Sequence, residues 1–172
     1  MRVRRSAIAL LAAPFLAAAL LTGCSKDHAA SGEPVEYQAQ DLRTGDPVDL
    51  ADLQGKAVLV SSWATWCAPC RKELPELDRL YQDRKAEGLE VVAVNVDPAG
   101  ASSKQVIPTV DELELTMPTW KDGEAGFVEA FGAVSVPTNV LVGRDGEVIE
   151  RWNGPIDPDS DEVRAAIDEA LG

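Results

Sequence analysis

Histidine, cysteine and basic residues are scarce in this chain of 172 residues. It has one histidine and three cysteines, and only 16 lysines and arginines stand against 29 acids, which gives a net charge of −13. Because the strongly negative net charge of the chain repels a phosphate backbone, we expect no nucleic acid among its partners. The hydrophobic content of 45% is enough for one packed core. No internal repeat is visible, and we predict one globular domain.

Residues 1–23 have the composition of a secretory signal peptide. Three arginines precede an almost unbroken apolar run over residues 6–21, which is shorter than the roughly 20 residues that a spanning helix needs. The run ends in LTGC, small residues before a cysteine, and so resembles the lipobox of bacterial lipoproteins. The resemblance implies that Cys24 is lipidated and holds the protein on the outer face of the cell membrane. An uncleaved anchor helix and ordinary secretion with a free thiol are the alternatives, and both also place the domain outside the cytoplasm.

Residues 24–34 are polar, with alanine and glycine, and predict a flexible tether. Cleavage after residue 23 would remove three arginines and no acids, so the net charge would change from −13 to −16. Anionic lipid head groups repel so acidic a domain. A tether that lets the domain stand away from the membrane is therefore consistent with its charge.

Residues 35–172 alternate β-rich with amphipathic segments and predict a single α/β domain. The apolar segments 57–63 and 89–96 predict buried strands, and the amphipathic helix expected over 71–87 would join them in a parallel crossover. Pro75 should bend or break that helix. We also predict a β-hairpin from strands 35–42 and 47–50, helices over about 103–115, 124–131 and 159–171, and strands over 116–121, 139–142 and 147–152.

Two cysteines, Cys67 and Cys70, directly follow the first buried strand. A structural zinc ion needs four cysteine or histidine ligands, and the only histidine, His28, lies in the tether, so we expect no metal. A purely structural disulfide that closes so small a loop would add little stability. If Cys24 is lipidated, no other thiol remains, and the pair lies in a compartment where disulfides persist. A redox pair is favoured, with the metal site and the structural crosslink as alternatives.

The expected helix start suggests a different role for each cysteine. Unpaired N–H groups and the helix dipole favour the thiolate of a cysteine at a helix N-terminus, so we predict Cys67 as a partly exposed nucleophile. Cys70, one turn further, would be shielded and would resolve the mixed disulfide. Trp66 beside them either excludes water from the pair or is an ordinary core aromatic residue.

The motif WCAPC at residues 66–70, with Trp63 before it and Val136-Pro137-Thr138 far downstream, resembles the thioredoxin superfamily. The resemblance implies a central mixed sheet flanked by helices, with an added N-terminal β-hairpin and a central insertion that residues 98–115 would supply. It also implies that Pro137 is cis and lies opposite the cysteines, and that the backbone of Val136 pairs with an extended substrate chain. An ordinary trans proline is the alternative.

Three further segments resemble the TlpA/ResA-like branch, whose members are membrane-attached, extracytoplasmic thiol-disulfide oxidoreductases. They are LADLQGK at residues 50–56, RKELP at 71–75 and VVAVNVD at 91–97, and the whole resemblance covers residues 35–171.

A glutamate that matches Glu73 lies near the redox pair in ResA-like proteins and is linked to its acid–base properties. Here helix spacing puts Glu73 on the same side as Cys70, where a carboxylate would accept the thiol proton. The alternative is an ordinary solvated acid. Six residues before the first cysteine, cytosolic thioredoxins have a buried aspartate, whereas this chain has Ser61. Arg71 and Lys72 either stabilise the thiolate or are simply solvated.

The resemblance implies an enzyme that reduces protein disulfides without a bound cofactor. The family often prepares apocytochrome c, whose C-x-x-C-H haem site must be reduced, with electrons from a membrane thiol carrier of CcdA type. A disulfide-forming oxidase on the same fold is the nearest alternative, because Ala68-Pro69 does not decide the direction. A non-catalytic peptide-binding lipoprotein and a peroxidase of the peroxiredoxin kind are the others.

Overall fold

The structure is a computed structural model that describes residues 32–172 except Ala99 and Glu124. The expected signal peptide, Cys24 and most of the expected tether lie outside the described residues. The strands are β1 (Gln38–Asp41), β2 (Pro47–Asp49), β3 (Ala57–Trp63), β4 (Leu89–Asn95), β5 (Thr119–Lys121), β6 (Thr138–Val142) and β7 (Val148–Asn153). The helices are α1 (Ala68–Arg84), α2 (Ser103–Glu112), α3 (Gly126–Phe131) and α4 (Asp161–Leu171), with 3-10 turns η1 (Leu50–Leu53) and η2 (Lys85–Glu87).

The seven strands form one mixed sheet in the order β2-β1-β5-β4-β3-β6-β7. β3 pairs with β4 in parallel and with β6 antiparallel, and α1 makes the expected crossover between β3 and β4. The predicted hairpin is confirmed, because β1 and β2 pair antiparallel. β1 also pairs with β5, so the hairpin extends the central sheet. Every residue of β3, β4 and β6 is buried, which explains their nearly continuous apolar sequences.

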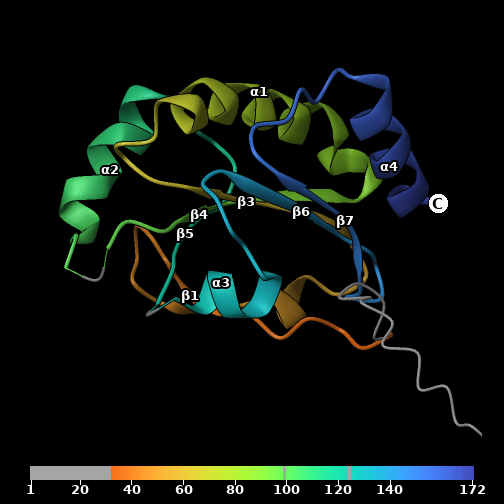
Figure 1. Ribbon diagram of the computed structural model, residues 1–172, viewed down its shortest axis with the longest axis horizontal. Helices are drawn as coiled ribbons and strands as arrows, with labels where there is room; N and C mark the ends of the chain where they lie inside the picture. Colours follow the sequence, from red (N-terminus) through yellow and green to blue (C-terminus); the bar gives the residue numbers. More distant parts are fainter. Residues whose placement is uncertain (1–31, 99, 124) are drawn as a thin grey trace, which may run out of the picture.

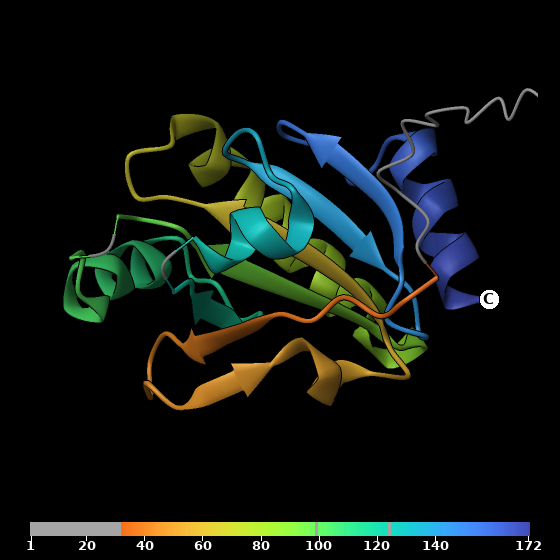
Figure 2. The ribbon, with the colours of Figure 1, turned by 60° about the horizontal axis from the view of Figure 1, so that its bottom comes forward.

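Helices cover both faces of the sheet (Figure 1). Each face has its own hydrophobic core. One core packs α1, α2 and α4 against the sheet and includes Trp63, Cys67 and Cys70. The other lies under α3, which crosses the opposite face of the sheet in Figure 2, and contains Tyr37, Trp120, Phe127 and Phe131. The segment expected to be an insertion supplies α2, which buries Val106 and Val110 in the first core.

Helix α1 begins at Ala68, three residues earlier than predicted, and it is not broken at Pro75. A proline within a helix costs about 3 kcal/mol. The buried side chains of Leu74 and Leu77 flank Pro75 and hold this part of α1 on the sheet, which offsets that cost. The earlier start places Cys70 within the first turn of the helix. None of the helices in residues 32–172, with Ala99 and Glu124 set aside, is long and apolar enough to cross a membrane.

Candidate active site

Cys67 and Cys70 form a disulfide at the N-terminal end of α1. Cys67 is the N-cap residue, and its sulfur accepts a hydrogen bond from the backbone N–H of Cys70 at 3.3 Å. Its carbonyl oxygen accepts the N–H of Arg71 at 3.2 Å, the first hydrogen bond of the helix. When the pair is reduced, the same N–H and the positive end of the helix dipole favour a thiolate on Cys67. The geometry therefore suits a reactive thiol at residue 67.

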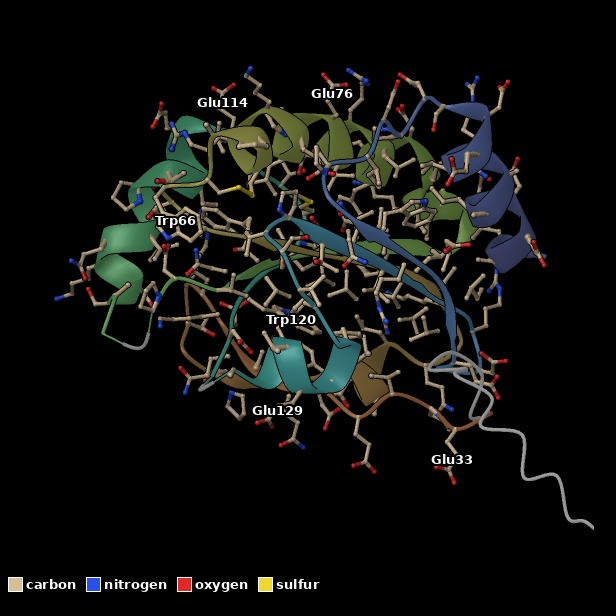
Figure 3. All side chains as sticks on the ribbon, in the orientation of Figure 1. Glu33, Trp66, Glu76, Glu114, Trp120 and Glu129 are labelled. Carbon is tan, nitrogen blue, oxygen red and sulfur yellow. A yellow bond between two sulfur atoms is a disulfide. The ribbon has the colours of Figure 1, made fainter. Side chains whose placement is uncertain are left out.

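The exposure of Cys67 differs from the prediction, whereas that of Cys70 agrees with it. Cys67 is only 3% exposed, so the expectation of a partly exposed nucleophile is wrong for the disulfide form. The reason is that the loop before β6 lies against it, with the carbonyl oxygen of Val136 3.7 Å from the Cys67 sulfur. Trp66 is 66% exposed, which excludes a core role, and it lies at the surface near the start of α1 (Figure 3). Cys70 is fully buried, as expected.

The loop that faces the disulfide is fixed by hydrogen bonds to the sheet. The Val136–Pro137 peptide bond is cis, as the resemblance implied. The N–H of Thr138 donates to the Ser62 hydroxyl at 2.8 Å, and the N–H of Gly154 donates to the carbonyl of Pro137 at 3.0 Å. Val136 itself precedes β6 and takes no part in the pairing of β6 with β3. Its backbone is therefore placed beside the disulfide without belonging to the sheet.

The turn before the cysteines is held by Asp97, which the sequence analysis did not identify. The Asp97 carboxylate accepts the backbone N–H of Thr65 at 3.1 Å, the Thr65 hydroxyl at 3.1 Å and the Asn95 amide at 2.9 Å. These residues follow or end β3 and β4, and parallel neighbours end at the same edge of a sheet. A polar residue two positions after the end of each of two buried strands was the available signal. Asp97 thus fixes the backbone that leads into Trp66 and Cys67.

Glu73 lies in the protein interior and is 5% exposed, so the solvated-acid alternative is excluded. One carboxyl oxygen, Oε1, accepts the side-chain N–H of Asn139 at 2.8 Å and the backbone N–H of Ile156 at 2.7 Å. Burial raises the pKa of Glu73 to about 7, although the two hydrogen bonds oppose this shift. The carboxyl group therefore exchanges a proton near neutral pH. Asn139, at the start of an apolar strand, was not identified from the sequence.

In the disulfide form, the two basic residues after the pair contact another residue or solvent, and their effect on a thiolate stays a prediction. Arg71 forms an ion pair with Glu112 of α2 at 2.9 Å, and Lys72 is exposed. Within the described part of the chain, no group of three or more histidine, cysteine, aspartate or glutamate residues is arranged to hold a metal ion.

Comparisons with known proteins place this site in a family. Residues 32–151 match the AhpC/TSA family. The chain is 33% identical over 122 residues to the thiol-disulfide oxidoreductase ResA of Bacillus thuringiensis subsp. konkukian, a match that covers 71% of this chain and 68% of the relative. It is 34% identical over 110 residues to ResA of Bacillus subtilis, with 64% of this chain and 60% of the relative covered.

Solved structures agree with the fold. A Chlorobium tepidum protein provisionally named thiol:disulfide interchange protein DsbE superposes with a TM-score of 0.72 at 26% identity, covering 81% of this chain and 96% of that one. StoA from Bacillus subtilis superposes with a TM-score of 0.64 at 21% identity, covering 77% of this chain and 96% of that one. These likenesses confirm the predicted thioredoxin fold.

The raised pKa of Glu73 predicts how stability changes with pH. Its pKa rises from 4.5 to about 7 on folding, so between these values the folded state binds more protons than the unfolded state. The free energy of unfolding should therefore fall by about 3 kcal/mol as the pH rises from about 4.5 to about 7. Urea denaturation of the disulfide form across this range should show a fall in the wild type that is smaller by about this amount in Glu73→Gln, where only other carboxyl groups with a raised pKa, such as that of Asp122, contribute.

Glu90 offers a matched control, because it is also a buried glutamate but is paired with Lys56 at 2.7 Å. The Glu90→Gln variant should keep the wild-type fall. A Glu73→Gln profile parallel to that of the wild type would contradict the assignment of the titration to Glu73.

Proposed function

The chain belongs to the AhpC/TSA family and, within it, to the ResA-like thiol-disulfide oxidoreductases. From this premise we propose that it reduces disulfides of extracytoplasmic proteins. In this proposal, lipidated Cys24 holds the protein on the outer face of the cell membrane. The observation that carries the proposal is the position of the Cys67–Cys70 disulfide, at a helix N-terminus and against the carbonyl of Val136.

In the first step, the Cys67 thiolate of the reduced protein attacks a substrate disulfide. A mixed disulfide forms between Cys67 and one substrate sulfur, and the other substrate sulfur leaves as a thiolate and takes a proton. The N–H of Cys70 and the dipole of α1 stabilise the attacking thiolate. The backbone of Val136 and the face of Pro137 align the extended substrate chain, and exposed Trp66 contacts it from the other side.

In the second step, Cys70 resolves the mixed disulfide. Its thiol gives up a proton and its sulfur attacks the sulfur of Cys67, which forms the Cys67–Cys70 bond and releases the second substrate sulfur as a thiolate that is then protonated. The substrate gains two electrons and two protons. The enzyme supplies both electrons and the proton of Cys70, and the solvent supplies the other proton, which Cys67 released when it ionised. Glu73 accepts the proton of Cys70, because it lies one helical turn further on α1, is buried like Cys70 and has a pKa of about 7.

The client that we propose is apocytochrome c, with electrons supplied by a membrane thiol carrier of CcdA type. What supports this is the resemblance to the TlpA/ResA-like branch, together with a site that needs no bound cofactor because the sulfur pair itself carries the two electrons. The lipobox-like LTGC sequence and the polar tether support an extracytoplasmic position, where haem attachment sites become oxidised.

Serine variants should separate the roles of the two cysteines. Cys67→Ser should abolish insulin reduction and the reduction of an oxidised C-x-x-C-H peptide, because no attacking thiolate remains. Cys70→Ser should still attack and should accumulate a covalent mixed disulfide, visible on non-reducing gels. Absence of insulin reduction by the wild type would instead favour a peptide-binding protein with incidental cysteines, and consumption of peroxide by the wild type would favour a peroxidase.

The reduction potential of the Cys67/Cys70 couple decides the direction of the reaction. Equilibration with dithiothreitol or glutathione buffers should give a value near or below about −270 mV, that of thioredoxin, because a reductant needs a reduction potential below that of its substrate. A value near about −120 mV, as in a strong oxidant, would refute the reductase and support a disulfide-forming oxidase.

The membrane anchor is tested by replacing the expected lipidated residue. Cell fractionation should find the wild-type protein with the membranes, and Cys24→Ser should lose the incorporation of a labelled fatty acid. Ser25→Ala, one residue away, is the control and should be lipidated as usual. Labelling of the Cys24→Ser variant at the wild-type level would show that the lipid is not on this residue.

A further inference from the structure

Three buried oxygen atoms beneath α1 have no hydrogen-bond partner among the described residues. They are Oγ of Ser61, Oε2 of Glu73 and Oδ1 of Asn139. The three residues are 1%, 5% and 0% exposed. Buried polar atoms are almost always paired, because leaving one unpaired costs about 1–3 kcal/mol. Three unpaired oxygens in neighbouring side chains therefore indicate a bound polar ligand.

The three side chains come together from three elements. Ser61 of β3 lies directly opposite Asn139 of β6 in the antiparallel ladder, so their side chains point to the same face of the sheet. The Asn139 side chain reaches Glu73 of α1, with 2.8 Å between Nδ2 and Oε1. The cluster therefore lies between the sheet and the helix that carries Cys70. Three polar partners suit a water molecule, which makes about three hydrogen bonds in a protein interior.

The hydrogen bonds already formed determine which atoms remain free. Nδ2 of Asn139 donates both to Glu73 and to the carbonyl of Gly154 at 3.1 Å, and this pair of acceptors fixes the orientation of the amide. Oε1 of Glu73 already accepts two N–H groups, including that of Ile156. A proton that Glu73 takes up is therefore placed on Oε2, the oxygen that belongs to the unpaired set.

We propose that Ser61, Glu73 and Asn139 bind an internal water molecule that passes the proton of Cys70 to Oε2 of Glu73. The water donates to Oδ1 of Asn139, exchanges a hydrogen bond with the Ser61 hydroxyl and contacts Oε2, which gives it the number of partners usual for a buried water. Ser61 and Asn139 are positioning residues. The proposal rests on the proposed role of Glu73 as proton acceptor and names the path that the proton takes.

The proton balance follows from the resolving step. As the Cys70 sulfur attacks the Cys67 sulfur, its proton moves to the water while the water gives another proton to Oε2. The water is left unchanged, Glu73 becomes neutral, and the electron pair of the broken bond leaves on the substrate thiolate. Glu73, whose pKa is about 7 in the disulfide form, then returns this proton to the solvent, from which the departing substrate thiolate takes one up.

The test compares Ser61→Ala with Ser61→Thr, which keeps the hydroxyl, in the full-length chain. Carbon-13 NMR of labelled glutamate gives the titration midpoint of Glu73 in the disulfide form, a readout that needs no activity. Ser61→Ala should raise this midpoint by about one pH unit, because the carboxylate loses a solvating partner. Ser61→Thr should keep the wild-type midpoint. Thr109→Val, which removes another buried hydroxyl, is the matched control and should also leave it unchanged.

A kinetic readout follows the same variants through the reaction. The reduced protein is mixed with the disulfide dithiobis(nitrobenzoate). Attack by Cys67 releases one coloured thionitrobenzoate ion, and resolution by Cys70 releases a second. In Ser61→Ala the rate of the second release should drop about tenfold near pH 7, while the first release stays unchanged. Equal second-release rates in the wild type and Ser61→Ala, or an equal loss in Ser61→Thr, would overturn the water path.

Two further measurements keep the proposal separate from the role on which it rests. If Glu73→Gln leaves the pH dependence of the second release unchanged, the role of Glu73 as acceptor fails. If Glu73→Gln removes that dependence but Ser61→Ala does not shift it, only the water path fails. In the wild type, cross-relaxation between the Ser61 Hβ protons and a long-lived water should be detectable, and its absence would refute the site without any variant.

Discussion

The structure of the site depends on one hydrogen bond at the start of α1, from the N–H of Cys70 to the sulfur of Cys67. Because a sulfur atom takes the place of the usual capping oxygen, the reactive atom is also the atom that stabilises the helix end. β3 delivers the chain to this point, Asp97 fixes the preceding turn, and Val136 closes the site from the opposite side. The sheet, the helix and the reactive sulfur are thus parts of one arrangement.

A second constraint is the burial of a carboxyl group behind the disulfide. Glu73 is held by Asn139 from β6 and by the backbone of Ile156 after β7, so it connects α1 with one half of the sheet. Burying it makes the folded state less stable at neutral pH than it would otherwise be, since the charged form is poorly solvated. The same burial gives the interior a carboxyl group, that of Glu73, which exchanges protons at the pH where thiols must be deprotonated. Stability is reduced at the point where the chemistry needs an acid–base group.

Much of the fold was predictable because its central strands are buried on both faces. Such strands have nearly continuous apolar sequences, so β3 and β4 were predicted within a residue of their observed bounds. Prediction was poorer where tertiary packing opposes local preference. Pro75 favours a broken helix locally, but the neighbouring Leu74 and Leu77 are buried against the sheet and α1 continues. The exposure of Cys67 was also misjudged, because it depends on a loop about 70 residues further along the chain.

The sequence by itself determined the redox pair, since the three-residue spacing of Cys67 and Cys70 and their position before an amphipathic helix are local features. Tertiary structure alone decided whether Glu73 is solvated or buried. Its partners Asn139 and Ile156 are 66 and 83 residues away, and no local pattern around Glu73 reveals them. Desolvation, which sets its proton affinity, arises only when α1 packs on the sheet. The local sequence thus determines which atoms react, whereas their acid–base environment exists only in the folded chain.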